Sequence, residues 1–294
     1  MIVITGSESF IGSCLAAGLD ARGISWTGID TVARHRCTQR ADIRDAAVAD
    51  LIPEGGTLIH LAAISRDGDC RQHPREAFDV NVGGTLNLIE AARRRGVRQF
   101  VFASSEWVYG EVANDEIQRE DSPLDATRLV SEYALTKLSG ERLLAGAARR
   151  GDFARVTILR FGIVYGPRPS NWSAVETLYD AVSHKNEVEV KGSLGTARRF
   201  LHVEDICSGI LSAVEKAATG FAVFNLSGDR LISLGEVIEE SMRLTGRRPR
   251  VAEGAPEAIS IRNPDNTRAR AELGWAPRYD LAAGLGTLAR PVAV

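Results

Sequence analysis

The chain has 294 residues, of which 44% are hydrophobic and 25% are charged, as expected for a globular protein with one large core or a core and a smaller lobe. Its net charge of −2 excludes a general positive field for nucleic acid or an anionic membrane, so an acidic ligand needs locally placed donors. The four cysteines are scattered without metal-ligand spacing, and no apolar run reaches membrane-spanning length, so we expect a cytoplasmic protein with free thiols and no metal site.

Short apolar segments alternate with longer helical patterns through the first two-thirds of the chain. The predicted strands are residues 2–5, 25–30, 57–61, 99–103 and 156–161. The predicted helices between them are residues 11–21, 74–95 and 129–149. Because the strands are continuously apolar and rich in β-branched residues, both faces of their sheet should be covered by helices. The pattern predicts an α/β fold with a doubly wound, Rossmann-type parallel sheet.

The regular alternation of strands and helices ends after residue 167, where the predicted elements become shorter and turn-forming residues lie closer together. A further strand is predicted at residues 221–226, followed by helices at 234–245 and 265–273. We interpret the last third as a small α/β substrate lobe that is interleaved with the end of the sheet. The expected division is a dinucleotide-binding domain of residues 1–167 plus 201–226, and a substrate lobe of residues 168–200 plus 227–294.

The turn after the first predicted strand has the spacing T-G-x-x-G-x-x-G, except that Ser9 occupies the second glycine position. Such a turn before a helix lets backbone N–H groups and the helix N-terminus meet a pyrophosphate. A serine is small, but it should crowd the site slightly where glycine allows close approach. We expect this turn to bind a dinucleotide through Gly6, Ser9, Phe10, Ile11 and Gly12.

An acidic residue follows at the end of the second predicted strand. Asp30 is placed to accept hydrogen bonds from the adenosine ribose hydroxyls, and its charge would repel a 2′-phosphate. NAD is therefore expected rather than NADP, although Arg34 and Arg36 just beyond could soften that preference. The ends of the following strands predict further cofactor contacts from Asp42, Ile43, Leu61, Ala62 and Ala63.

Three polar residues form the candidate catalytic set. Tyr133 and Lys137 are four residues apart in a predicted helix, so the phenol and the ammonium share one face. The ammonium should lower the pKa of the phenol toward working pH. Ser105 ends the fourth predicted strand, where its hydroxyl could bond the oxygen that gains or loses charge during hydride transfer. Strand alternation favours Ser105 over Ser104.

In this order, these motifs resemble the extended short-chain dehydrogenase/reductase family, the NAD-dependent epimerase/dehydratase group that modifies nucleotide sugars. The resemblance covers essentially all of the chain and adds Asn81 as a cofactor contact. It implies that Tyr133 takes a proton from a sugar hydroxyl while NAD takes hydride from the same carbon. It also implies that Arg198 reaches a substrate diphosphate, with Arg262 as a further phosphate ligand. A homodimer through the two long helices is expected as well.

The residues beside Ser105 bear on the reaction. In the family, 4,6-dehydratases have a Thr-Asp-Glu triplet where this chain has Ser105, Glu106 and Trp107. Glu106 keeps an acid at the first of the two acidic places, whereas Trp107 removes the second, so the dehydratase set is incomplete. Glu106 is therefore either a catalytic and substrate-binding acid or a carboxylate satisfied by neighbouring backbone. Trp107 is expected to be a pocket wall or a core residue.

Three hypotheses for the function follow. The first is an epimerase/dehydratase-type enzyme that oxidises a nucleotide-diphosphate sugar transiently at C4 and retains its NAD. The second is a net NAD(H)-dependent dehydrogenase or reductase of a 4-keto sugar or sugar acid, which the short segment between Arg168 and Arg198 makes credible. The third is a non-catalytic dinucleotide sensor, which has no need of the proton relay of Ser105, Tyr133 and Lys137.

Overall fold

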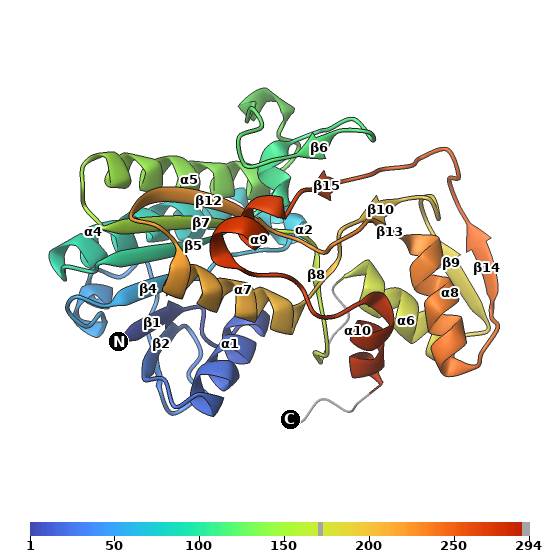
Figure 1. The fold of residues 1–294 in the computed structure, drawn as a ribbon, viewed down its shortest axis with the longest axis horizontal. Coiled ribbons are helices and arrows are strands. Elements are labelled where there is room, and N and C mark those ends of the chain that lie inside the picture. Colours follow the sequence, from blue (N-terminus) through green and yellow to red (C-terminus); the bar gives the residue numbers. More distant parts are fainter. Residues whose placement is uncertain (170–172, 290–294) are drawn as a thin grey trace.

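A parallel sheet of seven strands forms the centre of the computed structural model, which describes residues 1–169 and 173–289 (Figure 1). Its strand order is β12-β7-β5-β4-β1-β2-β3, and every neighbouring pair is parallel. This confirms the Rossmann-type α/β fold. The strands are β1 (Ile2–Thr5), β2 (Trp26–Asp30), β3 (Thr38–Arg40), β4 (Thr57–His60), β5 (Gln99–Ser105), β7 (Arg155–Phe161) and β12 (Gly220–Leu226).

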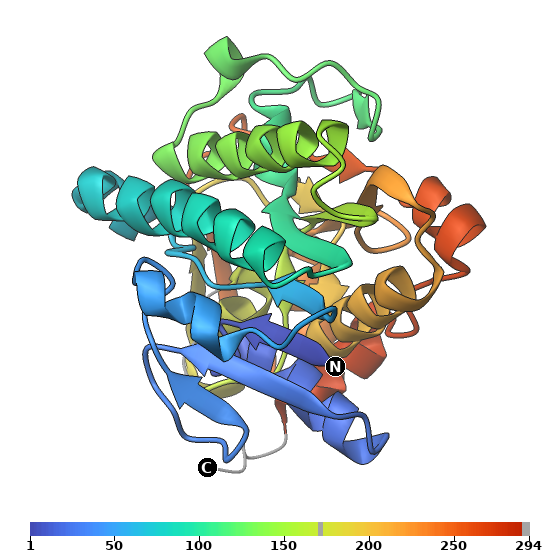
Figure 2. The same ribbon diagram turned by 90° about the vertical axis from the view of Figure 1, so that its left-hand side faces the viewer.

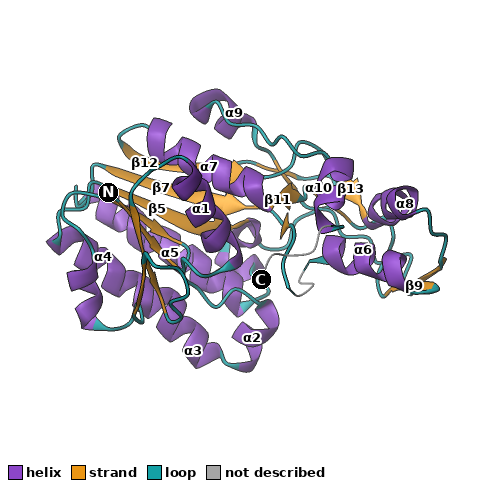
Figure 3. Ribbon diagram, turned by 90° about the horizontal axis from the view of Figure 1, so that it is seen from below, coloured by secondary structure: helices purple, strands orange, loops and turns teal. Residues whose placement is uncertain are grey.

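Helices cover both faces of the sheet (Figure 3). One face packs against α1 (Phe10–Ala21), α7 (Val203–Lys216) and α9 (Thr267–Leu273), and the other packs against α4 (Thr85–Arg94) and α5 (Glu132–Arg149). Successive strand residues point to opposite faces, so Ile4 joins the first layer and Val3 the second. Figure 2 shows α4 and α5 lying side by side on the outside of the second layer.

The helix predicted over residues 74–95 is one helical stretch with an irregular centre. It begins with α3 (Pro74–Phe78), widens into a π-helical segment at Asp79–Gly84 and continues as α4. Gly84 sits in this segment because a Cβ there would lie 2.6 Å from the side chain of Ile43. The short helix α2 (Asp67–Gln72), which the periodicity of the sequence did not predict, precedes this stretch.

The lobe beyond the carboxyl ends of the strands has a hydrophobic core of its own (Figure 1). Val175, Val237 and Leu285 bring together its three helices, α6 (Ala174–His184), α8 (Leu234–Thr245) and α10 (Leu281–Leu288). Two short strand pairs belong to this lobe, β9 (Glu187–Val190) with β14 (Arg250–Glu253) and β10 (Ala197–Arg198) with β13 (Ile232–Ser233). Two more short pairs lie outside the central sheet, β8 (Val164–Tyr165) with β11 (Leu201–His202) and β6 (Ile117–Gln118) with β15 (Asn263–Pro264).

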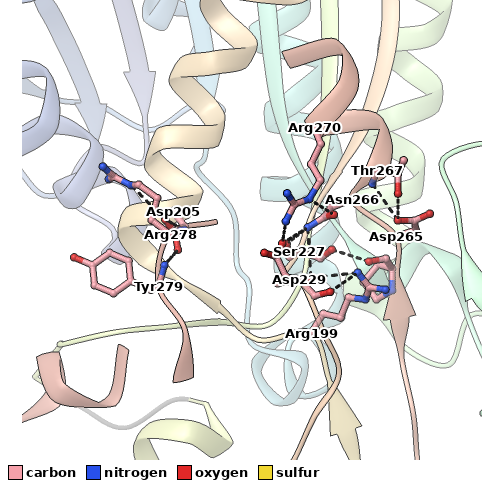
Figure 4. Close-up of polar contacts among 12 residues, drawn as sticks. Arg199, Asp205, Ser227, Asp229, Asp265, Asn266, Thr267, Arg270, Arg278 and Tyr279 are labelled. Atoms are coloured by element: carbon pink, nitrogen blue, oxygen red, sulfur yellow. Dashed lines mark hydrogen bonds and ion pairs between the residues drawn. The ribbon is translucent and has the colours of Figure 1, made fainter. Parts of the chain in front are cut away.

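Polar contacts fasten the last third of the chain to the sheet (Figure 4). Asp205, fully buried at the start of α7, accepts hydrogen bonds from the backbone N–H groups of Arg278 and Tyr279, both at 3.0 Å. Asn266 donates to the carbonyl of Ser227 at 2.9 Å, just after β12. The helix α9 accordingly packs on the sheet side, against α7 and β12, rather than among the lobe helices.

A buried histidine joins the strand ends at the edge that faces the lobe. The ring of His60 lies between the hydroxyls of Thr5 at 2.7 Å and Thr85 at 2.9 Å. Burial lowers the pKa of His60 to about 3, so the ring is neutral and links β1, β4 and α4 by hydrogen bonds alone. Within residues 1–169 and 173–289, no helix combines the length and apolarity needed to cross a bilayer.

Candidate active site

A cavity of about 1450 Å³ opens at the carboxyl edge of the sheet, between the first turn and the lobe. This exceeds the ~300–1,000 Å³ of an ordinary small-molecule pocket, as a dinucleotide plus a substrate would require. Parallel strands end at the same edge, which is why residues from distant parts of the sequence meet here. The cavity is lined by fourteen of the residues that the sequence predicts for the site: Gly6, Ser9, Phe10, Ile11, Asp30, Asp42, Ile43, Leu61, Ala62, Ala63, Ser105, Trp107, Tyr133 and Lys137.

The glycine turn has the geometry that a dinucleotide needs. Gly6 has a φ of +73°, and a Cβ there would lie 2.7 Å from the backbone nitrogen of Ala62. Ser9 has a φ of −70°, which any residue adopts, so its backbone has no need of the usual glycine. Its hydroxyl accepts a hydrogen bond from the Gly12 N–H at 3.1 Å and caps α1. The serine therefore serves the helix N-terminus.

Two carboxylates line the adenosine end of the cavity. Asp30 accepts the backbone N–H groups of Glu8 at 3.0 Å and Val32 at 3.2 Å, which joins the glycine turn to the end of β2. Asp42 is bound by Arg44, with Nη2 and Oδ2 2.6 Å apart, and this hydrogen bonding lowers the pKa of Asp42. Negative charge at this end suits the ribose hydroxyls of NAD and opposes a 2′-phosphate.

The candidate catalytic residues predicted from the sequence come from β5 and the first two turns of α5. Ser131 caps α5 by accepting the Ala134 N–H at 3.2 Å, which fixes where the helix begins. Tyr133 then lies in the first turn, where the nearby Ser105 hydroxyl favours the charged form of its phenol and so lowers its pKa. Lys137, one turn later and 4% exposed, donates from Nζ to the carbonyl of Ala103 at 2.9 Å. Its Nζ lies 5.7 Å from the centre of the Tyr133 ring.

The expected lowering of the phenol pKa by the lysine is wrong for the protein alone. Burial raises the pKa of Tyr133 to about 12, and the nearby Ser105 hydroxyl offsets only part of that rise. Burial also lowers the pKa of Lys137 to about 8. Both shifts favour the neutral forms, because the cavity wall replaces water around each group. The phenol of Tyr133 is therefore neutral near neutral pH in the protein alone.

A buried ion pair beneath the catalytic set was not predicted from the sequence. Arg160 on β7 binds both carboxylate oxygens of Glu141, at 3.0 and 2.8 Å, and the Ser104 hydroxyl donates to the same carboxylate at 2.6 Å. Tyr133, Lys137 and Glu141 are spaced four residues apart on one face of α5. The ion pair therefore fixes the rotation of α5 against β5. The four-residue spacing of Tyr133, Lys137 and Glu141 is the sequence signal that could have placed Glu141 on the same helix face.

The side chain of Asn81 hydrogen-bonds other residues of the protein beside the cavity. Its amide nitrogen donates to the Ile64 carbonyl at 2.9 Å and to the Thr136 hydroxyl at 3.1 Å, and its amide oxygen accepts the Ile64 N–H at 2.8 Å. Asn81 thus ties the cavity-lining loop after β4 to α5. A contact between Asn81 and the cofactor stays a prediction.

Beside the Ser105 end of the site, Glu106 and Trp107 meet two arginines of the C-terminal third. Glu106 is 1% exposed, and neither carboxylate oxygen has a hydrogen-bond partner among the described residues. Burial raises the pKa of Glu106 to about 7, against the opposing pull of Arg262 and Arg198. The alternative that neighbouring backbone satisfies this carboxylate is therefore wrong.

The two arginines are held by backbone carbonyls in this state. Arg262 stacks over the Trp107 ring at 4.1 Å and donates to the Gly110 carbonyl at 2.7 Å. Arg198 donates to the Ser260 carbonyl at 2.6 Å. Trp107 lines the cavity and so forms part of its wall, as expected. The described lining does not include Gly12, Asn81, Glu106, Arg198 or Arg262.

Comparison with known proteins identifies the family. The model of the NAD dependent epimerase/dehydratase family matches residues 2–227. A UDP-glucose 4-epimerase of Corynebacterium glutamicum is 30% identical, over 95% of this chain and 91% of that protein. A dTDP-glucose 4,6-dehydratase of Streptomyces griseus is also 30% identical, over 97% and 91%. The chain belongs to the NAD-dependent epimerase/dehydratase family.

Solved structures agree with this membership. MoeE5 in complex with UDP-glucose and NAD has a TM-score of 0.87 and 31% identity, and the match covers 98% of this chain and 96% of that one. MoeE5 in complex with UDP-glucuronic acid and NAD gives 0.86 and 31%, over 97% and 96%. The protein is thus an NAD-dependent enzyme of the epimerase/dehydratase type, and NAD is its cofactor.

Proposed function

We propose that this enzyme is a 4-epimerase of a UDP-hexose that works by transient oxidation at C4 and keeps its NAD bound. The observation that carries this proposal is the meeting of Ser105, Tyr133 and Lys137 in one cavity with the glycine turn. MoeE5, similar over almost the whole chain, binds UDP-glucose and UDP-glucuronic acid together with NAD.

In the proposed reaction, Tyr133 takes the proton of the C4 hydroxyl and later returns it. Ser105 lines the same cavity as Tyr133, so we propose that its hydroxyl bonds the same oxygen as that oxygen becomes a carbonyl. Lys137 adds positive charge beside the phenol. When bound, NAD supplies the hydride acceptor and, in its oxidised form, a positive ring that further favours the phenolate. Rotation of the keto intermediate before hydride returns would invert C4.

Epimerisation is favoured over dehydration because the chain lacks one acid of the dehydratase pair. Glu106 stands at the first acidic position, but the indole of Trp107 at the second is neither an acid nor a base near neutral pH, and Arg262 stacks over its ring. The alternative is a net dehydrogenase or reductase of a 4-keto sugar or sugar acid. That reaction would use the same proton relay but would exchange NAD(H) at each turnover.

The test is to incubate the purified protein with UDP-glucose or UDP-glucuronic acid and follow the products by proton NMR and the absorbance of NADH. We expect the C4 epimer to form without accumulation of NADH. NADH in equal amount to the product would contradict the proposal and indicate a net dehydrogenase, and a 4-keto-6-deoxy product would indicate a dehydratase. Failure of every UDP-sugar to react would also contradict it.

We further propose that Arg198 and Arg262 bind the substrate diphosphate, exchanging backbone carbonyls for phosphate oxygens. Guanidinium groups suit this exchange because phosphate is the stronger acceptor and can be bound by two parallel hydrogen bonds. The phosphates would then neutralise the two arginines, whose positive charge now lowers the pKa of Glu106. The pKa of Glu106 would rise further, so we propose that Glu106 keeps its proton and acts as an acid beside the sugar. Arg262→Ala should raise the KM for the UDP-sugar far more than it lowers kcat, and unchanged steady-state constants would contradict this role.

The raised pKa of the buried Glu106 carboxyl should make the free energy of unfolding depend on pH. Its folded pKa of about 7 lies above the usual 4.5, so the folded state holds a proton that the unfolded state releases. Stability is therefore lost as the pH rises from about 4.5 to 7, by about 3 kcal/mol at ~1.4 kcal/mol per pKa unit. Glu106→Gln should remove this loss. Urea unfolding at pH 5 and pH 8 tests it, and parallel pH profiles for the two proteins would contradict the buried carboxyl.

We also expect a homodimer through the outer layer of α4 and α5 (Figure 2). Leu86 on α4 and Leu135 on α5 are large apolar side chains that remain 44% and 39% exposed, and Val130 just before α5 is 53% exposed. Burial of such side chains favours association. Light scattering at micromolar concentration should give twice the chain mass, and Leu86→Glu with Leu135→Glu should give a monomer. A wild-type monomer would contradict this interface.

A further inference from the structure

Glu8 makes contacts that neither the fold nor the proposed sugar chemistry requires. It lies in the glycine turn between Gly6 and Ser9 and lines the cavity together with Asp30 and Arg34. Its Oε1 accepts the backbone N–H of Arg34 at 3.1 Å and that of His35 at 2.9 Å. Both donors belong to the loop that follows β2, the strand that ends at Asp30.

Two successive backbone N–H groups that converge on one oxygen form an anion-binding site. Here the anion is a carboxylate of the same chain. Partial burial raises the pKa of Glu8, but hydrogen bonds from the His35 N–H, the Thr38 hydroxyl and the Arg34 N–H outweigh it, with a small contribution from the Arg34 guanidinium, so the pKa of Glu8 is lowered overall. An arginine and two free N–H groups beside the adenosine ribose would be the natural donors for a 2′-phosphate.

We propose that Glu8 is a determinant of cofactor choice, because its carboxylate occupies the anion site that the 2′-phosphate of NADP would need. Asp30 opposes that phosphate from the ribose side, and Glu8 removes the donors that could compensate. Together they explain how a loop containing Arg34 and Arg36 can still select NAD. Glu8 acts on cofactor choice alone, so a failure of the proposed epimerase reaction would leave this role intact.

The test compares the binding of NADH and NADPH to the protein and its variants, after release of bound nucleotide, by the fluorescence of the reduced cofactors. Glu8→Ala frees the backbone N–H groups of Arg34 and His35 and removes a negative charge near the Arg34 guanidinium. We expect the ratio of the Kd for NADPH to that for NADH to fall at least about tenfold, with the Kd for NADH nearly unchanged. Glu8→Gln keeps the size of the side chain and should lower the ratio by a smaller factor.

Glu76→Gln is the matched control. Glu76 is an exposed acid that lines the same cavity, so its loss changes the cavity charge equally but leaves the Arg34 and His35 N–H groups bound. The ratio should stay at the wild-type value in this variant. An unchanged ratio in Glu8→Gln, which should fold even if Glu8→Ala does not, would overturn the proposal. So would an equal fall in Glu76→Gln, because general charge would then account for the effect.

Discussion

Tyr133→Phe lowers turnover of the UDP-sugar at least ~100-fold and leaves NAD bound, if the phenol is the group that moves the C4 proton. The substitution removes one oxygen and keeps the ring, which packs in the first turn of α5. Lys137 keeps its hydrogen bond to the Ala103 carbonyl, so the cofactor side of the cavity should remain formed. Initial rates and the absorbance of retained NAD measure the two effects separately.

Tyr179→Phe is the control for this variant. Tyr179 lies on α6 in the lobe, packed against the lobe core, and has no part in the proposed proton transfer. It should lose little activity. Activity of Tyr133→Phe within a few-fold of wild type would show that another group moves the proton, and loss of NAD binding would show that the phenol serves mainly to hold the site together.

Glu141→Ala has the largest expected effect on stability. It removes the carboxylate that binds Arg160 at two points and accepts the Ser104 hydroxyl, in a place where both charged side chains are 4% exposed. Arg160 would be left charged and buried beside the sheet. Breaking a buried ion pair from one side typically costs about 3–5 kcal/mol, because the remaining charge is uncompensated. Urea unfolding measures this loss directly.

An exposed ion pair provides the comparison. Arg268 and Glu272 are four residues apart on α9, with side chains 40% and 48% exposed. Glu272→Ala should cost less than about 1 kcal/mol, because water screens an exposed pair and solvates the remaining partner. If Glu141→Ala cost no more than Glu272→Ala, the ion pair between Glu141 and Arg160 could not be what fixes α5 beside Ser105.

The fold could be predicted where local pattern and tertiary packing agree. Residues 2–5 and 234–245 have the bounds that the structure gives to β1 and α8. The first is a short apolar run that ends at a glycine turn, and the second is an amphipathic helix that begins at a capping box. The choice of Ser105 over Ser104 stays a prediction, although the Ser104 hydroxyl is already engaged by the Glu141 carboxylate at 2.6 Å.

Features that depend on contacts between distant residues could not be predicted. The direction of the Tyr133 pKa shift depends on how far the cavity wall excludes water, which spacing along a helix does not reveal. The carbonyls that hold Arg198 and Arg262 come from loops distant in the sequence. The same is true of Glu8, whose partners lie 26 and 27 residues further along the chain.

The fate of a deuterium label at C4 of the UDP-hexose tests the central claim most directly. Transient oxidation with retained NAD predicts that the label leaves C4 as hydride and returns to C4 of the epimer, with no hydrogen taken up from water. Mass spectrometry and proton NMR of the product would show this. Loss of the label to solvent, or its recovery in free NADH, would contradict the account.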